Sequence, residues 1–192
     1  PDKSVVQNRI REQIGALHYF LKDCRVLVIT YGTAWVYERI DTGEVVANCH
    51  KIPGTFFVRR LSSVQEIIES FQATQSMLET INPTLRYILT VSPVRHTRDT
   101  LELNGASKAV LRAACHQLAT VHDQVDYFPA FEIMMDDLRD YRFYKSDLLH
   151  PTDVAEEYIF EKFTETYFSE DTRAFLKQWE DIKRSLSHRP LN

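Results

Sequence analysis

The sequence is poor in several features that mark particular classes of protein. It contains no uninterrupted apolar run near the roughly 20 residues that a membrane-spanning helix needs, and Pro1 to Ser4 do not begin a signal peptide. Its three cysteines, Cys24, Cys49 and Cys115, are odd in number and far apart, so they do not resemble a disulfide framework. We therefore expect a cytoplasmic protein with no membrane partner.

Basic residues are scarce as well. The 23 Lys and Arg residues are outnumbered by 27 Asp and Glu residues, and no dense Lys/Arg cluster interrupts this balance, so we expect no nucleic-acid partner. His50, His96, Asp147 and His150 offer atoms that could bind a metal, but no Cys/His pair has the spacing of a structural zinc site. We expect neither a metal nor a cofactor.

What the sequence does have is an alternation of helical and strand-like patterns. Its 192 residues, of which 44% are hydrophobic, suffice for one sizeable core and one domain. Short β-branched runs at 25–31, 86–91 and 125–128 predict buried strands. Apolar periodicity predicts helices over 4–22, after the capping box Ser63/Glu66, from about 104, after Pro151 and over 171–186. This order predicts a parallel α/β sheet.

Polar residues follow each predicted strand, where ligands bind in open α/β sheets. The strand ends 32–35, 92–96 and 128–132 should meet at one edge, with Gly32, Thr33, Ser92 and His96 as candidate pocket residues. Residues 35–50 read as an inserted hairpin with Gly43 in its turn, which would act as a lid. Asn48 and His50, at its end, are further pocket candidates.

Asp147 and His150 form the most suggestive polar pair. In the stretch Asp147-Leu148-Leu149-His150-Pro151, the carboxylate can accept one imidazole N–H and orient the ring as a general base. The pattern D-x-x-H is short and recurs by chance, so its position beyond the last predicted strand end carries much of the weight. We interpret His150 as the base and Asp147 as the orienting acid.

No nucleophile is evident beside this pair. Ser92 has a suitable position but precedes Pro93 and lacks the glycine-rich turn that exposes a nucleophilic serine. Thr33 and Ser107 read as turn or cap residues. Cys49 and His50 are neighbours on a predicted strand, where adjacent side chains point to opposite faces, so they do not form a Cys/His pair.

Several blocks of the sequence together resemble the GSCFA family, a bacterial family related to the SGNH/GDSL hydrolases. The resemblance covers about residues 9–163. The blocks are YGTAWVY (31–37), NCHK (48–51), TVSPV (90–94), SKAVLR (107–112), YFP with Glu132 (127–132) and LRDYRFYKSDLLHP (138–151).

The resemblance implies a three-layer, flavodoxin-like parallel sheet with flanking helices, of which this sequence lacks the first strands. It implies a domain over 1–168, with 169–192 as a helical extension packed on it. The SGNH block D-x-x-H matches Asp147 and His150. The motif G-S-C-F-A, whose serine matches the SGNH nucleophile, does not occur in the sequence, so the resemblance places the nucleophile upstream of Pro1.

A second departure from the SGNH pattern concerns the oxyanion hole. Where SGNH enzymes carry Gly-x-Asn, this sequence has Gly32-Thr33-Ala34, so the asparagine amide is missing. Loss of one such donor typically slows a reaction by about a hundredfold or more. Asn48, His50 and His96 are candidate substitutes.

Two functions are compatible with these observations. The first is hydrolysis or transfer of an ester, with a small acylated substrate such as an O-acyl carbohydrate. The second is a non-catalytic module that binds a ligand or a partner on the same scaffold. The helix over 171–186, with Phe175, Trp179 and Ile182 on one side, either covers the sheet or mediates homo-oligomer formation.

Overall fold

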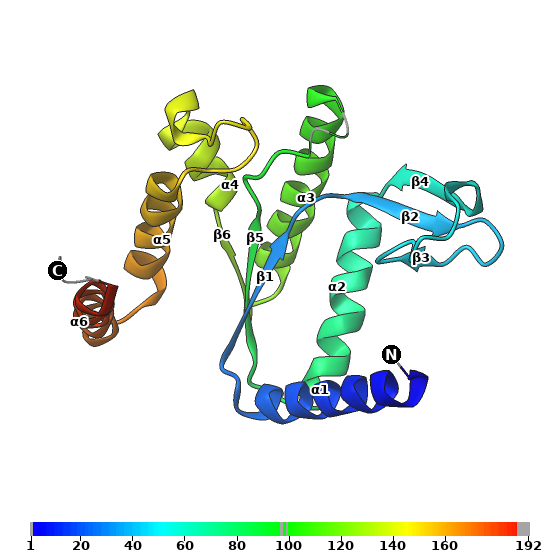
Figure 1. Ribbon diagram of the computed structural model, residues 1–192, viewed down its shortest axis with the longest axis horizontal. Coiled ribbons are helices and arrows are strands. Elements are labelled where there is room, and N and C mark those ends of the chain that lie inside the picture. Colours follow the sequence, from blue (N-terminus) through cyan, green and yellow to red (C-terminus); the bar gives the residue numbers. More distant parts are fainter. Residues whose placement is uncertain (1, 97, 99, 188–192) are drawn as a thin grey trace. The chain divides into compact units, whose positions relative to one another are not determined.

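The computed structural model describes residues 2–96, 98 and 100–187 and divides into two compact units, residues 1–131 and 132–192 (Figure 1). The strands and helices of unit 1 follow in chain order. They are α1 (Lys3–Asp23), β1 (Val26–Tyr31), β2 (Trp35–Arg39), β3 (Val45–Val46), the 3-10 helix η1 (Gly54–Phe56), β4 (Phe57–Leu61), α2 (Val64–Glu79), β5 (Arg86–Val91), α3 (Leu101–Val121) and β6 (Val125–Phe128). The short helix α4 (Ala130–Glu132) ends at the boundary of unit 1.

The three predicted strands form one parallel sheet in the order β1-β5-β6. Val26 pairs with Arg86 and Tyr31 with Val91, so β1 and β5 end at the same edge. This confirms the prediction of an α/β protein with a parallel sheet flanked by helices. The carboxyl ends of β1 and β5 carry the Gly32 turn and the Ser92 segment.

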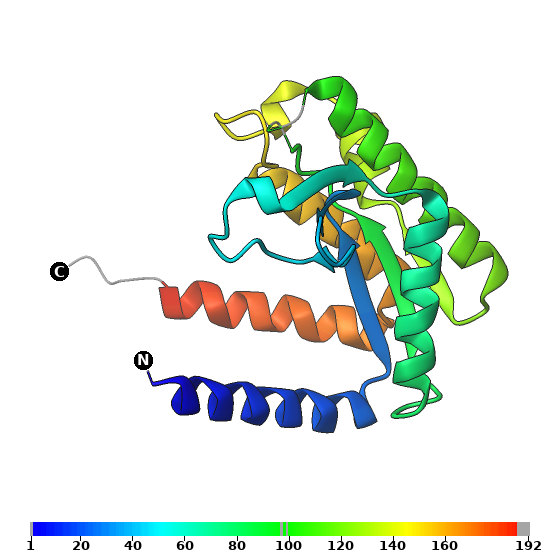
Figure 2. The ribbon, with the colours of Figure 1, turned by 90° about the vertical axis from the view of Figure 1, so that its right-hand side faces the viewer.

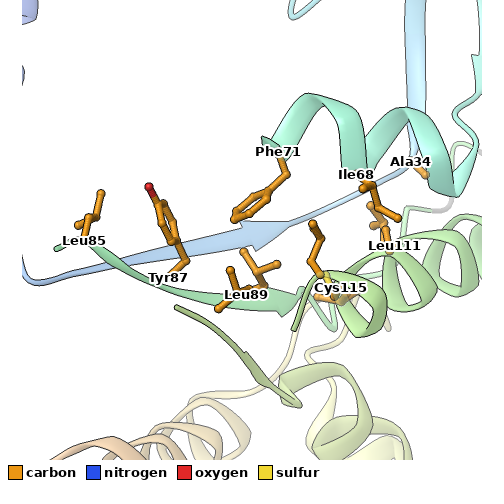
Figure 3. Packing of buried hydrophobic residues seen from close by; sticks show 12 residues of the cluster. Ala34, Ile68, Phe71, Leu85, Tyr87, Leu89, Leu111 and Cys115 are labelled. Atoms are coloured by element: carbon orange, nitrogen blue, oxygen red, sulfur yellow. The ribbon is translucent and has the colours of Figure 1, made fainter. Parts of the chain in front are cut away.

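Helices α2 and α3 share the main core with one face of this sheet. Figure 3 shows Phe71 and Ile68 of α2 and Leu111 and Cys115 of α3 beside the β5 side chains. Phe71 meets Tyr87 edge-on, with ring centroids 5.3 Å apart. The predicted capping box of α2 is present, because Ser63 accepts the Glu66 N–H and Glu66 accepts the Ser63 N–H.

A second, antiparallel sheet has the order β3-β2-β4. Its β2–β3 hairpin turns at Gly43, which has a φ of 69° that favours glycine. The second strand is shorter than predicted, since it contains only Val45–Val46 rather than 45–50. Strand β4 was not predicted, because its sequence FVRRL does not alternate clearly between apolar and polar residues.

Two predictions about burial were wrong. The helix over 4–22 is present as α1, a single helix extending from the start of β1 (Figure 2), but Leu21 is its buried residue and Ile10, Ile14 and Leu17 are exposed. Strand β1 is covered on one face only. On the other face Val26 and Val28 are 43% and 47% exposed, and β1 is an edge strand of its sheet.

Unit 2 contains the loop of Asp147 and His150. Its elements are the π-helix η2 (Ile133–Leu138), the 3-10 helix η3 (Tyr141–Phe143), α5 (Asp153–Tyr167) and α6 (Glu170–Ser187). Met134, Tyr144 and Ala155 are its buried apolar cluster. None of the helices in the described residues of either unit is both long and apolar enough to cross a bilayer.

The start of two helices differs from the prediction. Helix α3 begins at Leu101 with Thr100 as its N-cap, which places Ser107 inside the helix rather than at its start. Helix α5 begins at Asp153 with Thr152 as its N-cap, so Pro151 does not open it. Instead Pro151 pairs with Tyr144 in an antiparallel bridge. Both shifts matter for the sites below.

Candidate functional site

The turn after β1 is held by a serine of α3. The Ser107 hydroxyl accepts the N–H of Ala34 at 2.7 Å and lies 3.1 Å from the Thr33 hydroxyl. The Thr33 oxygen also accepts the N–H of Trp35 at 3.2 Å. Ser107 is therefore a buried residue that fixes the Gly32–Trp35 turn, and not the helix cap that its sequence context suggested.

A buried lysine joins the ends of two strands at the same place. Lys108 Nζ donates to the Gly32 carbonyl at 2.7 Å and to the Ser92 carbonyl at 2.6 Å. Only 2% of Lys108 is exposed. Burial lowers its pKa to about 8, because desolvation disfavours the ammonium, while the two carbonyl acceptors favour it.

His96 completes this cluster in unit 1. The backbone N–H of His96 donates to Asn104 Oδ1 at 2.9 Å, which ties the segment after β5 to α3. A side chain at position 32 would bring a Cβ atom within 3.5 Å of His96 Nε2, so the imidazole lies over Gly32. Gly32 and Thr33 thus follow β1, Ser92 and His96 follow β5, and the contacts of Lys108 and His96 hold these two segments together.

Asn48 and His50 lie elsewhere in unit 1, in the loop after β3. Asn48 Oδ1 accepts the His50 N–H at 2.8 Å, and His50 and Lys51 have φ angles of 49° and 63°. The prediction that Cys49 and His50 lie on a strand was wrong, because this segment is a tight turn. Among the three candidate oxyanion donors, His96 is the one beside Gly32.

In unit 2, a closed loop presents Asp147 and His150. The Tyr144–Pro151 bridge and a hydrogen bond from Lys145 N–H to the His150 carbonyl, 2.8 Å long, close the loop at its base. Leu148 has a φ of 58°, a conformation uncommon for leucine, which lets the chain reverse between the two polar residues. Tyr144 is buried, so the base of the loop is anchored in the unit 2 core.

Within the loop, the two side chains are already in contact. Asp147 Oδ2 lies 2.7 Å from His150 Nδ1. Asp147 Oδ1 accepts the N–H groups of Leu149 at 2.8 Å and His150 at 3.0 Å. These backbone hydrogen bonds, first that of His150 and then that of Leu149, together with the imidazole, lower the pKa of Asp147 to about 2.

The tautomer of His150 follows from this arrangement. An ionised carboxylate can only accept hydrogen bonds, so the hydrogen between the two residues belongs to Nδ1. In the neutral ring this leaves the lone pair on Nε2. Both side chains are exposed, and Nε2 can therefore act as a base toward a hydroxyl group.

A family model, that of the GSCFA family, matches residues 1–163. The chain belongs to the GSCFA family. The matched residues include Lys108 with the strand ends that it contacts, and the Asp147–His150 loop. No curated protein matches the chain. In the described residues no three His, Cys, Asp or Glu side chains gather as a potential metal site.

The main functional candidates that sequence reasoning missed in the GSCFA chain are Lys108 and Asn104, and it misread Ser107. A signal was present. Lys108 is spaced three, seven and ten residues before Leu111, Cys115 and Leu118, all of which are buried. A lysine on the apolar stripe of a helix needs a polar partner inside the protein.

Proposed function

We propose that this chain carries the general base and the orienting acid of an ester hydrolase. His150 is the base and Asp147 the orienting acid, and the nucleophile is a serine in a segment upstream of Pro1. The observation that carries the proposal is the 2.7 Å contact between Asp147 Oδ2 and His150 Nδ1, which leaves Nε2 of the neutral ring as the base.

The chemistry proceeds by acyl transfer. His150 Nε2 takes the proton of the serine hydroxyl as the serine oxygen attacks the ester carbonyl. The resulting imidazolium then protonates the leaving alcohol as the carbon–oxygen bond breaks. Asp147 stays ionised throughout, since its pKa of about 2 lies far below neutral pH. A water molecule hydrolyses the acyl-enzyme by the same two proton transfers.

The proposal includes a relation to the SGNH/GDSL hydrolases and their flavodoxin-like sheet. Such a sheet would have further strands beside β1. Two observations support this extension: β1 is an edge strand, and Val26 and Val28 on it are 43% and 47% exposed. A strand added beside β1 would pair its unpaired backbone groups.

The Gly32 turn is our candidate for an anion-binding segment within unit 1. The Ala34 N–H already donates to Ser107 and is not available to a substrate. His96, whose ring lies over Gly32, is the side chain that we propose as a donor in place of the missing asparagine. The substrate that we propose is a small acylated molecule, with an O-acyl carbohydrate as the leading class.

The occupied Ala34 N–H also favours a second candidate, a ligand-binding module without turnover. The test is hydrolysis of p-nitrophenyl acetate and butyrate by the full natural protein, its variants Asp147→Asn and His150→Ala, and the 192-residue chain. A matched control is His116→Ala, which removes an exposed histidine of α3.

We expect activity in the full protein and the His116 variant, a loss of about a thousandfold or more in the His150 variant, and a smaller loss in the Asp147 variant. The 192-residue chain should be inactive. If the full protein is inactive on these esters, or if His150→Ala retains full activity, the hydrolase proposal is wrong for these substrates. The binding module then becomes the leading candidate.

A further inference from the structure

We infer that Lys108 is a positioning residue that clamps the ends of β1 and β5 and thereby sets the geometry of the Gly32 turn. Its ammonium bridges the Gly32 and Ser92 carbonyls, 2.7 Å and 2.6 Å away. The role in catalysis rests on the proposed function, whereas the role in holding the two strand ends does not.

The clamp acts where the hydrogen bonds of the sheet stop. The β1–β5 ladder ends with the pair Tyr31 and Val91, followed by the hydrogen bond from Ser92 N–H to the Tyr31 carbonyl at 2.9 Å. Beyond that point the two chains diverge into separate loops. Lys108 provides the next link between them, and it reaches them from the middle of α3.

Ser107 and Asn104 hold the same two segments from the same helix. Ser107 accepts the Ala34 N–H on the β1 side, and Asn104 accepts the His96 N–H on the β5 side. Three polar residues within five positions of α3 therefore anchor both strand ends. Lys108 differs from the other two because it contacts both ends at once.

The charge of Lys108 has a second consequence. Its two acceptors are neutral carbonyl groups, so the 2%-exposed ammonium places a positive charge behind the Gly32 turn. Negative charge on a group bound at the turn would be stabilised by this charge. Lys108 itself is too deeply buried to touch a substrate.

The first test measures hydrogen exchange of individual backbone amides in the 192-residue chain at pH 7. The variants are Lys108→Met, which keeps the length of the side chain, Lys108→Arg, which keeps the N–H donors, and Leu118→Ala. Leu118 is the matched control, because it is equally buried on α3 and has an apolar role in the core.

We expect Lys108→Met to speed exchange of the Ala34 and Ser92 amides by about tenfold or more while Leu89, in the middle of β5, is less affected. Lys108→Arg should restore part of the protection. The inference is overturned if exchange at Ala34 and Ser92 is unchanged, or if Lys108→Met accelerates the whole sheet evenly as Leu118→Ala does. If Lys108→Met does not fold, the comparison of Lys108→Arg with Leu118→Ala decides between these outcomes.

The second test measures ester hydrolysis by the full natural protein carrying the same variants. We expect Lys108→Met to lower kcat by about a hundredfold with little change in KM, because a misplaced turn weakens binding of the transition state more than that of the substrate. A change in KM alone would contradict the catalytic role. If the wild-type protein is inactive but Lys108→Met still speeds exchange locally, the hydrolase proposal is wrong for these substrates, and the role of Lys108 in holding the two strand ends is supported.

Discussion

Lys108 should make the stability of unit 1 depend on pH in a way that can be calculated from its surroundings. Burial lowers its pKa from 10.5 to about 8 in the folded protein. Between these two values the unfolded chain binds one more proton than the folded protein does, so the free energy of unfolding rises with pH. Well below pH 8 both states are protonated, and the free energy of unfolding no longer changes with pH through this group.

The size of the gain follows from the two pKa values. From pH 7 to pH 10 the free energy of unfolding of the wild type should rise by about 2.5 kcal/mol relative to a protein without this lysine. The neutral amine still has two N–H groups for the Gly32 and Ser92 carbonyls, so deprotonation need not break these contacts. The figure is an upper estimate because the carbonyl groups favour the ammonium.

The assay is urea unfolding of the wild type and Lys108→Met at several values between pH 7 and pH 10. Trp35 lies in unit 1 and Trp179 in unit 2, so a Trp179→Phe background makes tryptophan fluorescence report on unit 1. The difference between the two proteins should change with pH in favour of the wild type. If the free energy of unfolding has the same pH dependence in both proteins over this range, burial does not lower the pKa of Lys108.

Two further predictions concern the core and the Asp147 loop. Phe71→Ala should lower the free energy of unfolding of unit 1 by about 3–5 kcal/mol, because it opens a cavity and removes the edge-on contact with Tyr87. Met77 on the same helix is exposed, so Met77→Ala should lower this free energy far less. Equal losses in the two variants, measured by urea unfolding, would contradict the packing of Phe71 in the core. The pKa of Asp147, measured by carboxyl NMR, should be about 2, below the ordinary value of 3.8. Ionised Asp147 should therefore stabilise the loop above pH 4, and this stabilisation should be lost as the pH falls through about 2. A midpoint near 4 would show that the loop hydrogen bonds are not formed in solution.

The strands of the parallel sheet could be predicted because their sequence patterns are typical of strands and not of helices. Residues 86–91 and 125–128 are short apolar runs that end in polar or proline-containing segments, and both became strands with the predicted bounds. Because β1 and β5 are parallel neighbours that end at the same edge of the sheet, Gly32 and His96 lie close together. Local pattern and sheet topology were enough to predict the neighbouring strand ends of unit 1.

Burial was harder to predict, because it depends on which elements lie nearby. Helix α1 has the predicted apolar stripe, yet Ile10, Ile14 and Leu17 on it are exposed. Periodicity predicts which side of a helix is apolar, but it does not predict which element packs against that side. The burial of Lys108 was not predicted, because its residue type indicated exposure. A lysine is normally solvated, and only the positions of two distant carbonyl groups make its burial intelligible.

The Asp147–His150 contact was predicted as a hypothesis, and the structure adds what the sequence could not contain. The positive φ of Leu148 and the two backbone N–H groups on Asp147 Oδ1 depend on how the loop closes. These features fix the carboxylate before any substrate arrives. The pairing itself was predictable because D-x-x-H places the two side chains within reach.

The proposed hydrolase depends on activation by His150 of a serine that lies upstream of Pro1. The most direct measurement is labelling of the full natural protein with a fluorophosphonate, which reacts with activated serines, followed by mass spectrometry to locate the label. We predict one labelled serine upstream of Pro1, with labelling abolished by His150→Ala and retained in His116→Ala. Absence of label, labelling of Ser92, or labelling that survives loss of His150 would contradict the account.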